Sequence, residues 1–206
     1  MPSYKLQYFD GKGRAELARL LFAAAGKEYE DERLGGETWL AAKPNTPYGQ
    51  LPVLVVDKVQ INQSGAIFRY LARELGFYGN NNMENTRCDV VLETISDLIT
   101  DMVKVMFEKD EEKKAEQGKN MKEVSLPKFL TFFAKTLKDN GGKYLVGSAL
   151  TVADIAFFDI MDRVVSDPIF GEATWKGYSE LEGLSQRVKS LPNIQKWLEK
   201  RPQTSF

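Results

Sequence analysis

The sequence changes its hydrophobic pattern near residue 80, and this change limits the folds that are open to the chain. Residues 1–77 alternate short strand-like and helix-like segments in the order β-α-β-α-β-β-α. From Met83 onward helical spacing dominates, and strand signals largely disappear. This order predicts a compact α/β unit with helices on a mixed four-stranded sheet, followed by an all-helical region.

The segments of the first part are short and well delimited. In chain order they are YKLQYF, RAELARLLFAAAG, EYEDERL, ETWLAAK, PVLVV, KVQIN and SGAIFRYLAREL. Gly26 ends the first expected helix as a C-cap, and Pro44 ends the second. Asp57 and Lys58 form the turn of an expected hairpin. We therefore expect strands and helices that pack as one α/β layer structure.

A stretch rich in glycine and asparagine, GFYGNNNMEN, separates the two patterns. We expect a first domain at residues 1–77, a linker at 78–82 and a helical domain at 83–206. In GSALTVADIAFF, Thr151 can cap a helix whose third residue, Asp154, reaches back to the cap amide. This capping box predicts a helix start and not a catalytic group.

Charge balance and the absence of histidine exclude several classes of function. The 28 basic and 29 acidic side chains give a net charge of −1, so we do not expect nucleic-acid binding. The chain has no histidine and one cysteine, Cys88. These counts exclude nucleophile pairs that need histidine, most catalytic zinc sites, internal disulfides and CxxC redox chemistry. Helical spacing predicts a buried Cys88, so any nucleophile is another side chain or comes with a ligand.

Location is predicted from equally simple features. No segment has the length and hydropathy of a membrane span. After Met1, Pro2 and Ser3 the chain passes directly into a strand pattern, with no charged leader and no apolar signal core. We expect a cytoplasmic protein that does not bind membranes.

The turn in QYFDGKGRAELARLLF joins a strand to a helix, as phosphate-binding loops do. A dinucleotide fingerprint needs glycine three places after Gly13, but Glu16 stands there. A carboxylate in the first helical turn would also repel a phosphate. Arg14 opens the helix, where the helix dipole mildly disfavours a cation. The turn is therefore not predicted to bind a nucleotide, and Arg14 needs another explanation.

Two further stretches offer groups for ligand binding. QINQSGAIF brings a strand end to Gln63 and Ser64 at a helix start, where free amides and a hydroxyl can hold a carboxylate. Taken alone, Ser64 is also explained as a helix cap. In PYGQLPVL, a cis bond before Pro52 would offer the backbone of Leu51 to an extended ligand, although spacing alone does not decide the isomer.

Together these features resemble the cytosolic glutathione transferases, and are most similar to the sigma class. The resemblance covers essentially the whole chain. It rests on the order of elements and on Tyr8, Arg14, Trp39, Lys43, GQLPVL, Gln63, Ser64 and TVADI. It implies a thioredoxin-like first domain that binds glutathione. The helical domain would form most of the cleft for a hydrophobic co-substrate.

The resemblance also implies a role for each site residue. Tyr8 would donate its hydroxyl proton to the glutathione sulfur and stabilise the thiolate, with electrostatic support from Arg14. Glutathione would further be bound by Trp39, Lys43, Gln50, Leu51, Pro52, Gln63, Ser64 and, from the partner subunit of a homodimer, Asp97. The co-substrate cleft would include Phe9, Gly13, Val103, Lys104 and Phe107. Taken singly, these residues also have structural readings, such as the packing of Tyr8 on the sheet.

The implied activity is attack of glutathione thiolate on hydrophobic electrophiles, and also reduction of organic peroxides. Glutathione would be a co-substrate, with no permanently bound cofactor and no metal. Alternatives are a carrier for haem or other apolar ligands, a structural relative such as a lens crystallin, and a prostaglandin H to D isomerase. In the isomerase branch a metal-binding acidic cluster would fall on Glu93, Ser96 and Asp97, and a cleft tryptophan near Lys104. Because Ser96 is not acidic, we expect weak or no metal activation.

Overall fold

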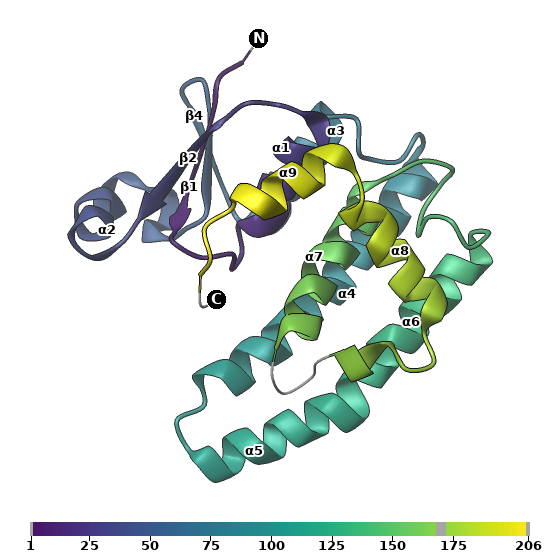
Figure 1. Cartoon of the computed structure of the whole chain (residues 1–206). Coiled ribbons are helices and arrows are strands. Elements are labelled where there is room, and N and C mark those ends of the chain that lie inside the picture. Colours follow the sequence, from purple (N-terminus) through teal and green to yellow (C-terminus); the bar gives the residue numbers. More distant parts are fainter. Residues whose placement is uncertain (1, 168–171, 205–206) are drawn as a thin grey trace. The chain divides into compact units, whose positions relative to one another are not determined.

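The computed structural model describes residues 2–167 and 172–204, and the contacts divide the chain into two compact units (Figure 1). Unit 1 contains Met1–Phe77 and Ser190–Phe206, and unit 2 contains Tyr78–Lys189. Each unit has its own buried core. No helix within the described residues is long and apolar enough to cross a membrane.

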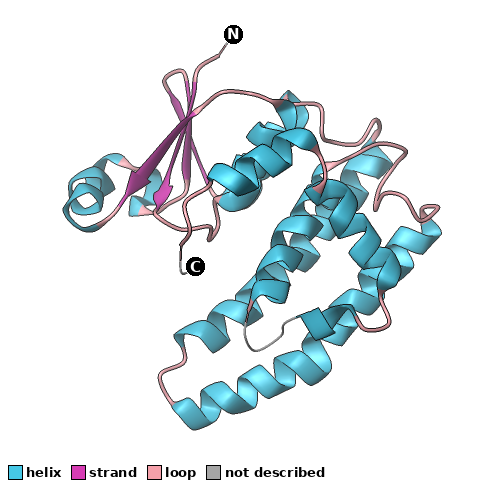
Figure 2. Cartoon of the chain, in the orientation of Figure 1, coloured by secondary structure: helices cyan, strands magenta, loops and turns pink. Residues whose placement is uncertain are grey.

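Unit 1 is built on a mixed sheet, as predicted. Its elements are β1 (Tyr4–Phe9), α1 (Glu16–Ala25), β2 (Glu30–Leu34), α2 (Gly36–Ala42), 3-10 turns at Lys43–Asn45 and Pro47–Gly49, β3 (Val53–Val56), β4 (Val59–Asn62), α3 (Ser64–Glu74) and α9 (Pro192–Lys200) (Figure 2). The strand order is β2-β1-β3-β4. Strand β1 is parallel to β2 and antiparallel to β3, and β4 is antiparallel to β3.

The alternating pattern of β1 directs consecutive side chains to opposite faces of the sheet. Tyr4, together with Leu6 and Tyr8, is buried, and its ring lies 5.4 Å from that of Phe22 in α1. On the opposite face, the ring of Phe9 lies 5.5 Å from that of Trp39 in α2. Strand β1 therefore ends with adjacent aromatic side chains on two faces of the sheet.

The last residues of the chain have contacts that the sequence pattern did not indicate. The sequence predicted one helical domain over 83–206, whereas α9 packs against α1 and buries Ile194 and Trp197 there. This packing groups residues 190–206 with unit 1. The assignment of functions to two domains stays a prediction.

Among the residues of unit 2 that the structure describes, the regular elements are all helical. Its elements are α4 (Asn82–Phe107), α5 (Glu111–Asn120), a π turn at Met121–Ser125, α6 (Leu126–Asp139), α7 (Val152–Ser166), a 3-10 turn at Glu172–Trp175 and α8 (Ser179–Lys189). Helix α7 contacts α4 and α8, and residues 151–161 are all buried. A helix buried on every side is the centre of its core. Helix α8 was not singled out in the sequence, where Gly183 interrupts its pattern.

The start of α7 closes around Asp154, as the predicted capping box requires. Its carboxylate accepts the N–H groups of Thr151 at 2.8 Å and of Leu145 at 2.7 Å. Burial raises the pKa of Asp154 to about 6, although these hydrogen bonds act in the opposite direction. Cys88 is buried in α4 as predicted, and burial raises the pKa of its thiol to about 11.

Candidate functional site

A cavity of about 520 Å³ opens in unit 1 where β1 and β4 end. Its lining residues are Phe9, Arg14, Trp39, Gly49, Gln50, Leu51, Pro52, Asn62, Gln63 and Ser64. Most of the site residues predicted in the first 77 positions therefore lie around one space. Gly49 and Asn62 also line the cavity and were not predicted from the sequence.

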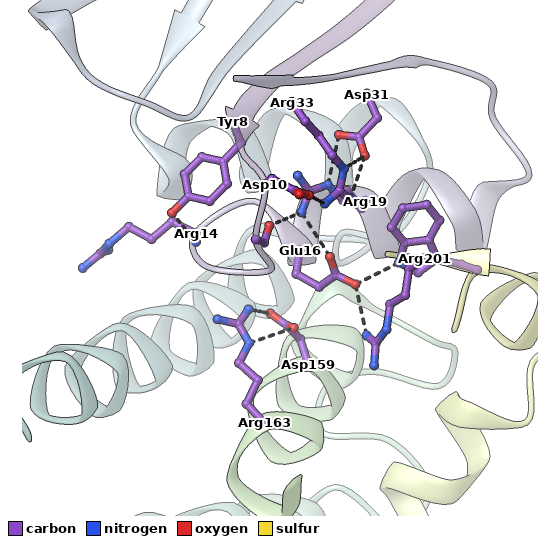
Figure 3. Close-up of polar contacts among 12 residues, drawn as sticks. Tyr8, Asp10, Arg14, Glu16, Arg19, Asp31, Arg33, Asp159, Arg163 and Arg201 are labelled. Atoms are coloured by element: carbon purple, nitrogen blue, oxygen red, sulfur yellow. Dashed lines mark hydrogen bonds and ion pairs between the residues drawn. The ribbon is translucent and has the colours of Figure 1, made fainter. Parts of the chain in front are cut away.

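Tyr8 lies at the end of β1, and its side chain is almost completely buried. Its hydroxyl oxygen accepts the backbone N–H of Arg14 at 3.0 Å (Figure 3). Gly13, at φ +37°, makes this contact possible, because a Cβ atom there would lie 2.4 Å from the Tyr8 hydroxyl oxygen. Since the oxygen already accepts one hydrogen bond, the phenolic proton can be donated to another group.

Arg14 contributes to the site through both its backbone and its side chain. The side chain is exposed, lines the cavity and points away from the other labelled charged residues of unit 1 (Figure 3). It makes no ion pair within the described part of the chain. A guanidinium in this position places a permanent positive charge at the cavity. Tyr8 is not among the lining residues and contacts Arg14 through the backbone amide of Arg14.

The segment before β3 supplies backbone to the cavity wall. The Leu51–Pro52 bond is cis, as the resemblance implied, and Pro52 is buried. Gly49 has φ +58°, and an ideal Cβ there would lie 3.5 Å from Cε of Lys43. Lys43 itself is exposed and does not line the cavity.

Gln63 and Ser64 form the start of α3 at the cavity. Gln63 has φ +68°, and its carbonyl accepts the N–H of Ile67 at 3.0 Å. No side chain caps this helix, and its first turn has no acidic residue. The first amides of a helix have no acceptor within the helix. These amides, the Ser64 hydroxyl and the positive end of the dipole are suited to bind a carboxylate.

The remaining predicted residues lie in unit 2. Asp97, Val103, Lys104 and Phe107 are exposed on α4. Lys104 pairs with Asp101 at 3.0 Å. Their roles at a subunit interface and in a co-substrate cleft stay predictions. No group of three or more His, Cys, Asp or Glu suited to hold a metal occurs in residues 2–167 and 172–204.

A buried cluster behind the turn was missed by the sequence analysis. The carboxylate of Glu16 is 1% exposed and accepts hydrogen bonds from Nε1 of Trp197 at 2.8 Å and from Nη1 of Arg201 at 3.1 Å (Figure 3). It also pairs with Nη1 of Arg19 at 3.3 Å. Glu16 therefore occupies the start of α1 as an internal anion.

The cluster continues from Arg19 into β2. Nε of Arg19 donates to Asp31 at 3.1 Å. Arg33 pairs with Asp31 at 3.0 Å and with Asp10 at 2.8 Å. Glu16 and Arg19 stand three positions apart, which is a common spacing for a helical ion pair. The spacing of Glu16 and Arg19 was the one local sequence feature that could have indicated this cluster. The other members of the cluster lie in segments distant from α1 in the sequence.

Two families of known domains match the two parts of the chain. Residues 4–73 match the family described as glutathione S-transferase, N-terminal domain. Residues 96–201 match the family described as glutathione S-transferase, C-terminal domain. The two matches cover most of both units.

Individual relatives align over their whole length. Glutathione S-transferase 1 of Ascaris suum is 38% identical over 217 residues, with 100% of both chains covered. S-crystallin SL11 of Nototodarus sloanii is 38% identical over 210 residues, and hematopoietic prostaglandin D synthase of Gallus gallus is 38% identical over 206 residues, again with 100% of both chains covered. Sequences named as enzymes and as crystallins are thus similarly related to this chain.

Solved structures have the same fold. A Nu-class glutathione S-transferase from Haemonchus contortus superposes with a TM-score of 0.89 at 36% identity, and 100% of each chain is covered. A monomeric glutathione S-transferase from Necator americanus superposes with a TM-score of 0.87 at 37% identity, covering 99% of this chain and 100% of the other. With both domain families matched and full-length relatives at this identity, the chain belongs to the glutathione S-transferase family.

Proposed function

We propose that the chain activates glutathione as a thiolate at Tyr8 and conjugates it to hydrophobic electrophiles. The observation that carries this proposal is the Tyr8 hydroxyl, which accepts the Arg14 amide and keeps its own proton for a ligand. A free thiol has a pKa near 8.5, and lowering it by about two units requires about 2.7 kcal/mol. One or two charge-assisted hydrogen bonds supply this much free energy.

The cavity suggests how glutathione would be oriented. Its γ-glutamyl carboxylate would bind at the start of α3, on Gln63 and Ser64. Its cysteinyl backbone would pair with Leu51, beside the cis bond. The glycyl end would be held by Trp39, Lys43 and Gln50. This arrangement would direct the sulfur toward Tyr8 and Arg14.

The proposal includes an assembly and a cellular setting. In a homodimer, Asp97 of one subunit would reach the γ-glutamyl amine of glutathione bound to the other. A relative from Necator americanus is described as monomeric, so measurement of the molecular mass in solution tests the homodimer. Val103, Lys104 and Phe107 would contact the hydrophobic electrophile, together with Phe9 and Gly13. The enzyme would work in the cytoplasm, without a permanently bound cofactor, and would also reduce organic peroxides.

The test is glutathione conjugation to an aryl halide by wild type and Tyr8→Phe. We expect the variant to lose about 10- to 100-fold in kcat/KM at neutral pH, because one charge-assisted hydrogen bond is lost. Tyr29→Phe is a matched control in the same unit: Tyr29 is stacked on Phe22, and its buried hydroxyl has no hydrogen-bond partner in the described structure. Wild type without turnover, or Tyr8→Phe with the wild-type rate, would contradict the proposal.

A second candidate is isomerisation of prostaglandin H, since one relative is named a prostaglandin D synthase. At the positions of the expected acidic cluster, Ser96 separates Glu93 from Asp97 on α4. We therefore expect magnesium to increase any isomerase activity weakly or not at all. A clear increase in rate with magnesium would contradict this expectation. A crystallin-like or carrier role is less favoured, because Tyr8, Arg14, Gln63 and Ser64 are all present.

A further inference from the structure

We propose that Arg19 is a positioning residue for thiol activation. This inference rests on the proposed function of Tyr8 and adds a residue that does not line the cavity. Arg19 is fully buried in α1, so it is placed to act through the turn at residues 10–14 and not on a ligand. It would hold that turn in the conformation in which the Arg14 amide reaches the Tyr8 hydroxyl.

The main contact is a charge-assisted hydrogen bond to the turn itself. Nη1 of Arg19 donates to the Gly11 carbonyl at 2.7 Å. The Gly11 amide donates to the Phe9 carbonyl at 2.8 Å, so both polar groups of this peptide position are used. Gly11 is thereby fixed between the end of β1 and the interior of α1.

The next part of the turn leaves the Arg14 amide free for Tyr8. The Lys12 carbonyl accepts the amides of Ala15 at 3.1 Å and Glu16 at 2.9 Å. The Arg14 amide between these positions donates to the Tyr8 hydroxyl at 3.0 Å. A small shift of Gly11 would also move the Arg14 amide, because only two residues lie between Gly11 and Arg14.

A second arginine holds the other side of the same turn. Arg33 stands opposite Tyr8 in the parallel pairing of β1 and β2, and it binds Asp10 at 2.8 Å and Asp31 at 3.0 Å. Asp31 also accepts from Nε of Arg19 at 3.1 Å. The turn is therefore fixed at Asp10 and at Gly11 by two arginines that share one carboxylate.

The energetic cost of this cluster supports a role in geometry. Nη2 of Arg19 is buried and has no hydrogen-bond partner in the part of the chain that the structure describes. Buried ion pairs are weak contributors to stability, because desolvation offsets much of their attraction. The planar guanidinium, however, holds the Gly11 carbonyl and Glu16 through Nη1 and Asp31 through Nε in one rigid geometry, whereas an ammonium presents its donors from one nitrogen on a flexible chain.

The cluster also connects the turn to the C-terminal segment. Glu16, which pairs with Arg19, accepts from Trp197 at 2.8 Å and from Arg201 at 3.1 Å. A change at Arg201 can therefore loosen Arg19 without altering the turn directly. A change at Arg201 should therefore raise the pKa of the bound thiol, as a change at Arg19 does, but by less.

The test compares Arg19→Lys with wild type by ultraviolet titration of the glutathione thiolate in the enzyme complex. We expect the apparent pKa of the bound thiol to rise by about one unit, which is about a tenfold loss of thiolate at pH values well below that pKa. The KM for glutathione should change less than twofold, because the start of α3 is untouched. Exchange of the Arg14 amide with deuterium should become faster, and this readout needs no glutathione.

Arg163→Lys is the matched control, because it removes the guanidinium fork of a largely buried ion pair with Asp159 in unit 2. It should reduce stability without changing the thiolate pKa or the Arg14 exchange rate. The inference would be overturned if folded Arg19→Lys had the thiol pKa and the Arg14 exchange rate of wild type. It would also be overturned if Arg163→Lys showed the same change in both quantities as Arg19→Lys. If Arg19→Lys does not fold, the same two measurements are made on Arg201→Gln. A thiol pKa and an Arg14 exchange rate equal to those of wild type would then overturn the inference. Failure of the proposed function would instead be seen in wild type, as an absence of both bound thiolate and turnover.

Discussion

Two helices of unit 1 begin in similar surroundings and differ in their charge. Helices α1 and α3 both start near a strand end, and neither has a side-chain hydrogen bond at its N-cap. The first turn of α1 contains Glu16, whereas that of α3 has no acidic residue and faces the cavity. A helix start attracts an anion. In α1 that anion belongs to the chain, and in α3 the position is open to a carboxylate from a ligand.

The start of α7 in unit 2 extends this comparison. It contains an internal carboxylate, Asp154, that is fully buried and accepts two backbone amides. Like Glu16, Asp154 serves the fold and not a ligand. The starts of α1 and α7 thus carry a buried carboxylate of the chain, whereas the start of α3 carries none and lies at the cavity.

The largest effect is expected from removal of the internal anion of α7. Asp154→Ala leaves two buried amides without their acceptor, so the free energy of unfolding should fall by about 3 kcal/mol at pH 7. The folded pKa of about 6 exceeds the ordinary 3.8, so native wild type binds a proton as the pH falls and gains stability. This gain is about 1 kcal/mol between pH 7 and pH 5, and the variant lacks it.

Urea unfolding at both pH values measures this difference. The deficit of Asp154→Ala should be about 4 kcal/mol at pH 5, larger than at pH 7. Asp110→Ala is the control, because Asp110 caps α5 in an exposed position and should cost about 1 kcal/mol. If the difference in free energy of unfolding between wild type and Asp154→Ala became smaller at pH 5, the pKa of Asp154 would not be raised in the folded protein.

The next effect tests the turn that precedes α1. Gly13→Ala would place a Cβ atom 2.4 Å from the Tyr8 hydroxyl oxygen at a backbone φ of +37°. The hydroxyl must move, so kcat/KM for glutathione conjugation should fall about 100-fold. The control is Gly142→Ala, where φ is +80° and no atom lies within 4 Å of the added Cβ. The control should lose stability and keep its activity, and an active Gly13→Ala enzyme would contradict the role of this turn.

The smallest effect comes from giving α3 an anion of its own. Ala66 is exposed in the first turn of α3, so Ala66→Glu would resemble the start of α1. Repulsion of about 1 kcal/mol between this carboxylate and that of glutathione should raise KM about fivefold, and salt should reduce the effect. Ala66→Gln has nearly the same size without the charge and should keep the wild-type KM. An equal KM for Ala66→Glu would place the ligand carboxylate elsewhere.

Local patterns predicted most of the fold because they depend on neighbours in the chain. The alternation of β1, the C-cap at Gly26, and the capping of α7 by Thr151 and Asp154 were all predicted and are observed. The cis bond before Pro52 was implied by the family resemblance, and the spacing of residues alone could not give it.

Contacts between distant segments could not be predicted in this way. Glu16 is held by Trp197 and Arg201 across a separation of more than 180 residues, which no periodic pattern encodes. The left-handed backbone of Gln63 is also invisible in sequence, because glutamine has no preference for that conformation. Most residues of the cavity were therefore predictable as a family set, whereas Gly49, Asn62 and the buried cluster of Glu16 and Arg19 were not.

The burial of Cys88 has a consequence for an enzyme that handles electrophiles. This residue is the sole cysteine of the chain. Its burial, with a thiol pKa of about 11, leaves almost none of it as thiolate at neutral pH. The one thiol of the chain is therefore a poor competitor of glutathione for electrophiles at neutral pH. The reactive sulfur is thus not a residue of the protein and is renewed with each molecule of glutathione.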